Sequence, residues 1–327
     1  MWLGVLGLTL TLACPVAFAN TRTQIVHIAV ESTMIRPLDG QGKNWDGPRG
    51  GEPGVASKLV QSQGKRLVEK YMLEAGMGST LAPLAAKFAL EALDVIDKTF
   101  APPDPFGEIV ADGRVVGTLD VLQDTLTPRW NTRAAFVELS PSSVIELMLI
   151  DQDLSGAHDP IGTCSFQVPA LKDSVPIALT SMSCSDDLLA ASIVVQLADA
   201  PKIITPGRYR VGVARAGLPA TDRDGLAWDP SGLPDPRIEI TAGAKRFGCT
   251  KNEGQSAGVC EPTMTIDVDS TTTIGFRVVE VDALVDDEVG AASVADLVGR
   301  ETHRPIAMSV RGVTWAEIVL IPVPAPR

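Results

Sequence analysis

The sequence predicts a mainly β protein that consists of two tandem antiparallel β-sandwich modules. Short stretches of alternating apolar and polar residues, rich in β-branched side chains, recur along the 327 residues, as is typical of strands. The chain contains 29 glycines and 24 prolines, which favours many short strands joined by turns over a bundle of helices. A set of sequence blocks that occurs twice in the same order indicates that the fold is doubled.

The repeated blocks place the boundaries of the modules. Their order is the same in both copies, and their spacing is nearly the same apart from an insertion of 52 residues after the first block of the first copy. We therefore expect a first module at residues 22–198 and a second at residues 206–325, joined by a linker at 200–207. The matching blocks are residues 42–46 with 225–229, 103–105 with 234–236, 145–153 with 274–282, and 159–162 with 287–290.

Apolar stretches with strand-like alternation begin, cross and end each module. They are residues 25–30, 144–150 and 191–197 in the first module and 209–213, 274–281 and 316–321 in the second. Trp45 and Trp228 occupy matching blocks, and we expect both to pack in the cores rather than to stack on a ligand.

One segment of the first module has no counterpart in the second. Residues at about 52–100 place apolar side chains at helical spacing, and Ser79 and Thr80 are suited to cap a second helix that runs to about Lys98. The sequence therefore predicts a helical hairpin inserted into a loop of the first module. Its apolar face is expected to fold onto the sandwich or onto its partner helix, and a membrane- or partner-binding surface is the alternative.

The N-terminus has the features of an export signal. Its apolar run is too short to span a bilayer, and Ala17-Phe18-Ala19 has the small-x-small pattern of a cleavage site. We expect a signal peptide at residues 1–19 and a periplasmic, extracellular or envelope-associated protein. Cleavage at Cys14 to give a lipoprotein is the less favoured alternative. None of the later segments is expected to cross a bilayer.

Four cysteines follow the leader: Cys164, Cys184, Cys249 and Cys260. An even number in an oxidising compartment favours disulfides, for which three connectivities are possible. We favour the pairs that are close in sequence, Cys164 with Cys184 and Cys249 with Cys260. Four reduced thiols, buried as small apolar groups, are the alternative.

Charge and motifs exclude several classes of function. The net charge is −12 and there is no long run of Lys or Arg, so nucleic acid is not an expected partner. The sequence lacks a nucleophile elbow, a zinc-protease helix motif and a P-loop. Paired carboxylates can cleave glycosides, but aromatic residues make up only 5%, which is low for a sugar site. We therefore expect a protein that is not an enzyme.

Acidic side chains gather in loops of the first module. Asp151 and Asp153 are two residues apart at the end of a strand, so they point to the same side, and a short loop can bring Asp159 back to them. Asp46 and Asp104 lie in another loop. Converging carboxylates repel one another unless a cation joins them. Calcium accepts six to eight oxygen ligands from flexible loops, whereas zinc prefers His and Cys.

These motifs resemble those of the C2 domain family. Residues 151–162 are similar to its third calcium-binding loop, with Asp-x-Asp, an Asp six residues further on, and an apolar-Gly pair. Residues 104–106 resemble its Asp-Pro-aromatic step, and residues 125–131 (Thr-Leu-Thr-Pro-Arg-Trp-Asn) resemble one of its strand starts. The resemblance implies two tandem eight-stranded antiparallel sandwiches, C2-like, with the helical hairpin inserted in the first.

The resemblance also implies Ca²⁺ as the cofactor. The ligands that it implies are Asp46, Asp104, Asp151, Asp153 and Asp159 in the first module and Asp229, Asp235, Glu280, Asp282 and Asp287 in the second. The second set departs from the family, since a Glu replaces the first Asp of the pair and the loop is one residue shorter. The neighbouring acids Asp39, Asp97, Asp222, Asp224 and Asp286 are expected to be solvated loop residues.

Two functions stay open at this point. Calcium can tie the loops together, or it can bridge the acidic protein to an anionic phospholipid membrane. Outside the cytosol even a site with a dissociation constant of about 10⁻⁴–10⁻³ M fills. The alternative is a metal-free scaffold that binds another envelope protein.

Overall fold

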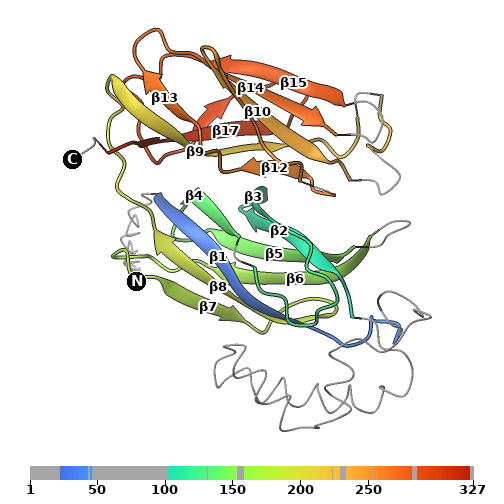
Figure 1. The fold of residues 1–327 in the computed structure, drawn as a ribbon. Helices are drawn as coiled ribbons and strands as arrows, with labels where there is room; N and C mark the ends of the chain where they lie inside the picture. Colours follow the sequence, from blue (N-terminus) through green and yellow to red (C-terminus); the bar gives the residue numbers. More distant parts are fainter. Residues whose placement is uncertain are drawn as a thin grey trace, which may run out of the picture.

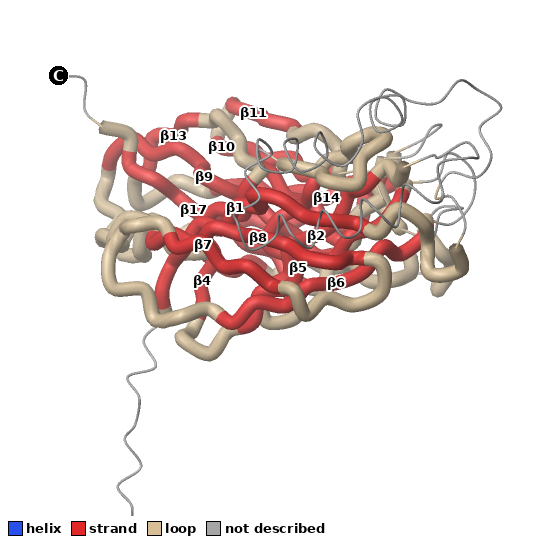
Figure 2. The backbone as a smooth tube through the Cα atoms, turned by 90° about the horizontal axis from the view of Figure 1, so that it is seen from below, coloured by secondary structure: helices blue, strands red, loops and turns tan. Residues whose placement is uncertain are grey.

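The computed structural model describes residues 23–42, 45, 102–130, 132–152, 158–222, 224–228, 233–252, 254–281 and 286–324. These residues form strands and loops only (Figure 2), so the prediction of a mainly β protein is confirmed for them. The described part of the chain also contains no helix of the length and hydropathy needed to cross a membrane. The predicted signal peptide at 1–19 and the predicted hairpin at about 52–100 lie outside the described residues.

The described part of the first module forms eight strands in two antiparallel sheets. One sheet has the order β4-β1-β8-β7 and the other β3-β2-β5-β6. Their bounds are β1 Gln24–Ile35, β2 Pro105–Ala111, β3 Arg114–Leu119, β4 Arg133–Leu139, β5 Val144–Asp151, β6 Asp159–Gln167, β7 Ile177–Ser181 and β8 Leu188–Leu197.

The second module has the same order of strands in its two sheets. One sheet has the order β11-β10-β14-β15, and the other β12-β9-β17-β16, with β13 also paired to β9. Their bounds are β9 Gly207–Gly217, β10 Pro236–Ala242, β11 Lys245–Gly248, β12 Ala257–Cys260, β13 Thr265–Val268, β14 Ile274–Glu280, β15 Asp287–Val294, β16 Ile306–Met308 and β17 Trp315–Pro322.

The prediction of eight strands in the second module is wrong by one. Both β12 and β13 pair with β9, in the place that the single strand β4 occupies beside β1 in the first module. Pro262 lies between β12 and β13. Because proline has no N–H to donate, it interrupts the ladder there and divides one strand into two.

Alternating side chains from the two sheets of each module meet in a separate apolar core. In β5, for example, Ile145, Leu147 and Leu149 are almost fully buried, and they join Ile28 and Val195 of the opposite sheet. Burial of each such side chain stabilises the fold by about 1.5–3 kcal/mol. A corresponding cluster fills the second module. Each module is therefore a β-sandwich with its own core.

Both predicted disulfides are present, Cys164–Cys184 and Cys249–Cys260. The tryptophans of the matching blocks also behave as predicted. Trp45 belongs to the first core and its Nε1–H donates to the carbonyl of Arg36 at 3.0 Å. Trp228 packs against the second core and donates to the carbonyl of Pro219 at 2.8 Å.

The two modules are stacked with a buried contact between them (Figure 1). Arg215 of β9 is the largest fully buried side chain of the described residues. Its guanidinium pairs with Glu317 of β17 at 2.7 Å and donates to the carbonyls of Val116 and Phe136 in the first module, each at 3.1 Å. Burial lowers the pKa of Arg215, and Glu317 opposes that shift.

Apolar and polar contacts surround this arginine. Phe136 lies in a small apolar cluster with Val213 and Val319 of the second module. On the other side of the interface the N–H and the hydroxyl of Ser256 both donate to Oε1 of Glu108, each at 2.7 Å. The modules are therefore joined by specific hydrogen bonds as well as by packing.

Candidate functional site

The ends of six strands define the candidate site. In the first module these are the start of β2, the end of β5 and the start of β6, and in the second module the corresponding ends of β10, β14 and β15. Figure 1 shows both groups of strand ends on the same side of the molecule, at the right of the view. We call them the first tip and the second tip.

Two buried acidic residues are joined by a hydrogen bond in the first tip. Asp104 precedes β2 and is 6% exposed, and Asp151 ends β5 and is fully buried. The backbone N–H of Asp104 donates to Oδ1 of Asp151 at 2.6 Å. Asp159 faces Asp151 across the β5–β6 pair and is exposed. The strand ends therefore bring together Asp104 and Asp151, with Asp159 one strand away.

A loop at residues 120–126 closes over these carboxylates. The N–H of Asp124 donates to Oδ1 of Asp104 at 2.6 Å. Asp124 has a φ of 52°, a left-handed conformation that Asp tolerates better than most residues. This conformation allows the loop to turn a backbone donor toward Asp104.

The second tip repeats this geometry. The N–H of Asp235, which precedes β10, donates to Oε1 of Glu280 at 3.3 Å. Glu280 ends β14, is 1% exposed and faces Asp287 across the β14–β15 pair. The N–H of Gly254 donates to Oδ1 of Asp235 at 2.7 Å, and Gly254 has a φ of 61°.

A lysine contacts the second tip. Nζ of Lys251 pairs with Oδ2 of Asp235 at 2.7 Å, and the two side chains are 39% and 14% exposed. Lys251 lies in the loop between β11 and β12, which the Cys249–Cys260 disulfide closes. This contact was not predicted from the sequence, because Lys251 belongs to none of the matching blocks.

The two tips also contact each other. A side-chain carbon placed on Gly254 would lie 3.4 Å from Nε2 of His158 and 3.5 Å from the ring of Phe106. His158 and Phe106 themselves pack edge to face, with ring centroids 5.2 Å apart. The loop that contacts Asp235 in the second tip therefore lies beside the first tip too.

The described residues include only part of each predicted ligand set. Four of the predicted ligands, Asp46, Asp153, Asp229 and Asp282, lie outside the described ranges. Within those ranges no three His, Cys, Asp or Glu side chains converge closely enough to bind a metal ion. The described part of each set is thus a pair, Asp104 with Asp151 and Asp235 with Glu280, and an exposed acid on the next strand.

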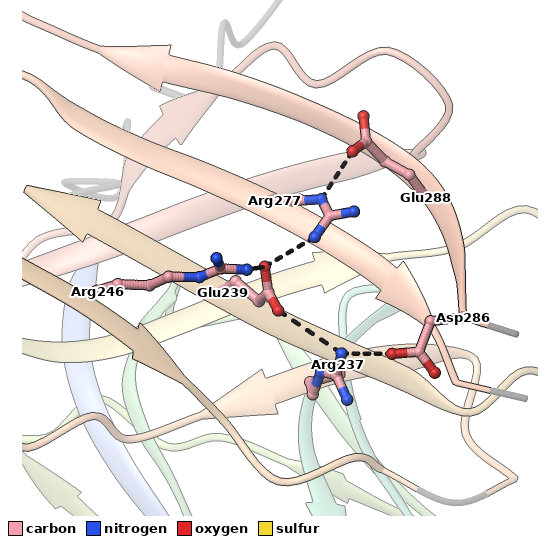
Figure 3. A network of polar contacts seen from close by, with 6 residues as sticks. All are labelled: Arg237, Glu239, Arg246, Arg277, Asp286 and Glu288. Carbon is pink, nitrogen blue, oxygen red and sulfur yellow. Dashed lines mark hydrogen bonds and ion pairs between the residues drawn. The ribbon is translucent and has the colours of Figure 1, made fainter.

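An ionic network lies beside the second tip, on the sheet formed by β11, β10, β14 and β15 (Figure 3). Glu239 accepts hydrogen bonds from Arg246 at 2.6 Å and from Arg277 at 3.0 Å. Burial disfavours the charged form of Glu239, but these hydrogen bonds outweigh burial and lower its pKa. Asp286 pairs with Arg237 at 2.6 Å, so this acid belongs to the network.

The sequence around the first tip is similar to a known protein family. A model of the family described as "C2 domain" matches residues 88–180, which contain both carboxylates of the first tip. The match covers 93 of the 327 residues and marks a similarity of this part of the first module to C2 domains. The second module has the same strand order as the first, although it lies outside the matched range.

Solved structures show distant similarity. Human GIVD cytosolic phospholipase A2 is 10% identical with a TM-score of 0.34, and the alignment covers 92% of this chain but only 32% of the phospholipase. A calcium-bound pair of C2 domains from Extended-Synaptotagmin 2 is 12% identical with a TM-score of 0.30, over 91% of this chain and 96% of that chain. Such TM-scores add nothing to the case for the fold. No curated protein sequence matches this chain.

Proposed function

We propose that the chain is a non-catalytic pair of β-sandwich modules that binds calcium at the first tip. One observation supports this most directly: two buried acids, Asp104 and Asp151, are joined by a hydrogen bond from the backbone of one to the carboxylate of the other, in a segment similar to C2 domains. Asp159 is one strand away, and Asp46 and Asp153 complete the proposed ligand set.

Electrostatics favours a divalent cation at this position. Two carboxylates that are both nearly excluded from water repel each other by several kcal/mol, as an order of magnitude, when both are ionised. Backbone donors to Asp104 and Asp151 offset part of this repulsion. The available ligands are all oxygens, which suit calcium better than zinc. Bound there, calcium supplies positive charge and ties the two loops together.

The resemblance to C2 domains supports a second part of the proposal, which concerns the partner. A calcium ion at a loop tip can also accept the phosphate of an anionic lipid, and it thereby offsets the repulsion between the membrane and a protein of net charge −12. The two disulfides support an exported protein, and calcium outside the cytosol is abundant enough to fill even a weak site.

Sedimentation with vesicles tests this function. The mature chain would be spun with vesicles of phosphatidylcholine and phosphatidylserine, in millimolar calcium or in chelator. We expect co-sedimentation in calcium only, and its loss in Asp104→Asn, which keeps the shape of the side chain but removes its charge. Equal sedimentation in chelator would contradict a role for calcium, and no sedimentation in either buffer would reject the lipid.

The second candidate is a metal-free scaffold of the cell envelope. The observation that favours it is Lys251, which already supplies positive charge to the second tip. A scaffold predicts that calcium changes neither the melting temperature of the chain nor its binding to vesicles. Turnover on a panel of ester and glycoside substrates, with a metal-depleted control, tests the proposal that the chain is not an enzyme.

A further inference from the structure

The loops that close the two tips are equivalent, hydrogen bond by hydrogen bond. In the first tip the N–H of Leu122 donates to the carbonyl of Pro105 at 3.0 Å, and in the second the N–H of Asn252 donates to that of Pro236 at 2.9 Å. The N–H of Thr125 donates to the carbonyl of Pro103 in the first tip, as the N–H of Gln255 does to that of Pro234 in the second. The N–H of Asp124 donates to the carboxylate of Asp104, as the N–H of Gly254 does to that of Asp235.

This equivalence assigns a partner to every residue of the loop. Leu122 corresponds to Asn252, so the residue before it, Val121, corresponds to Lys251. At this position the first tip therefore has an apolar side chain, Val121, and the second tip has a cation, Lys251. At the neighbouring positions the backbone makes the same bonds in both tips.

We propose that Lys251 is a built-in cation that replaces a metal ion at the second tip. The ammonium of Lys251 pairs with Asp235 at 2.7 Å, on the carboxylate that corresponds to Asp104 of the first tip. An ammonium and a divalent cation compete for the same carboxylate oxygens, so a tip with lysine at this position is held together without metal. The residue at positions 121 and 251 then decides which tip responds to calcium.

The structure supports Lys251 as a fixed part of the tip rather than a freely moving surface charge. The Cys249–Cys260 disulfide closes its loop. Within that loop Asn252 donates to Oγ1 of Thr118 in the first module at 3.0 Å, and Ser256 binds Glu108. These contacts limit the positions that the loop can take and so keep Lys251 close to Asp235.

Exchange of the residue types at positions 121 and 251 tests the proposal. Only the calcium titrations of this test rest on the proposed function. Calcium titration of Lys251→Val should show an additional binding event, at the second tip, that the unaltered protein lacks. Adding Asp235→Asn to this variant should remove that event. Val121→Lys should reduce calcium affinity at the first tip at least tenfold. If Asp235→Asn already weakens calcium binding in the unaltered protein, or if Lys251→Val binds no more calcium than the unaltered protein does, the proposal is overturned.

A second measurement works without any metal and so separates this proposal from the proposed function. In chelator, Lys251→Val should melt about 2 °C below the unaltered protein, because Asp235 loses its counter-charge, and Lys251→Arg should melt close to it. Adding Asp235→Asn to Lys251→Val should recover most of the loss. Strictly additive shifts would show that the lysine does not balance Asp235, and would overturn the proposal whether or not the first tip binds calcium. Lys251→Arg and Asp235→Asn keep the test decisive if Lys251→Val does not fold.

Discussion

The guanidinium of Arg215 in the second module donates a hydrogen bond of 3.1 Å to the backbone carbonyl of Phe136 in the first. Phe136 has a φ of 55°, and its ring lies between His27 of the first module and His303 of the second, with centroids 4.7 and 5.8 Å away. A buried charge and a strained backbone residue thus meet at the module interface. We infer that the two sandwiches form one body, which fixes the tips on the same side.

Arg215→Met is expected to reduce the free energy of unfolding by about 3 kcal/mol, because removal of one partner from a buried ion pair is costly. The variant also leaves the carbonyls of Val116 and Phe136 without their guanidinium donor. Urea denaturation measures the change. Arg114→Met is the matched control, since Arg114 binds the other oxygen of Glu317 at 2.8 Å but is half exposed, and it should cost about 1 kcal/mol or less. Equal costs would contradict the role given to Arg215.

Glu108→Gln is expected to raise the melting temperature at pH 7. Burial raises the pKa of Glu108 above its ordinary value of 4.5, although hydrogen bonds from Ser256 oppose that shift. A raised pKa means that this acid stabilises the fold below about pH 4.5 and that its contribution is lost as the pH rises through the folded-state pKa. Glutamine keeps an acceptor for Ser256 and has no charge to bury. The difference between the variant and the unaltered protein should shrink toward pH 4, and a gain that is the same at both pH values would contradict this explanation.

Glu239→Gln should show the opposite dependence on pH. Hydrogen bonds from Arg246 and Arg277 outweigh burial and lower the pKa of Glu239, so its contribution is present above about pH 4.5 and is lost as the pH falls through the folded-state pKa. The variant leaves the three neighbouring arginines of Figure 3 without their shared carboxylate. Melting curves should show a loss of stability at pH 7 that shrinks as the pH falls below 4.5 and through the folded-state pKa. If the variant remained less stable than the unaltered protein at low pH, the loss would come from altered packing and not from the charge of Glu239.

Replacement of Cys249 and Cys260 by serine is expected to cost about 3 kcal/mol, from the loop entropy that the disulfide removes in the unfolded chain. Since this loop contacts both tips, hydrogen exchange should also accelerate at the amide of Ser256, which binds Glu108. The control replaces Cys164 and Cys184, whose disulfide lies within the first module. Faster exchange of Ser256 in both variants would mean that the effect is global and not specific to the loop.

The sequence predicted six of the 17 strands of the described residues, those with the clearest local signal. Alternating apolar residues at 144–150 predict β5. The stretch at 191–197 is the C-terminal part of β8, and the stretch at 316–321 is the central part of β17. The predicted strand at 25–30 is five residues short of the end of β1 at Ile35. Its extension depends on bonds from Thr33 and Ile35 to a distant loop, Thr33 to Pro128 and Ile35 to Leu126, and a local pattern does not contain them.

The site could be predicted in part for the same reason. Asp104 and Asp151 occur in motifs with fixed spacing, and in the structure the backbone N–H of Asp104 donates to the carboxylate of Asp151. The contact of Lys251 with Asp235 joins the loop between β11 and β12 to the residue that precedes β10 and has no motif around it. The divided strand β12–β13 was also missed, although Pro262 was a usable signal.

Calorimetric titration of calcium into the mature protein tests the central claim most directly, with Asp151→Asn and Asp173→Asn as paired variants. Asp151→Asn keeps an acceptor for the N–H of Asp104, whereas Asp173 is an exposed acid in the loop between β6 and β7. The account predicts a calcium-binding heat that Asp173→Asn retains and Asp151→Asn loses. The same heat in all three proteins would contradict calcium binding at the first tip.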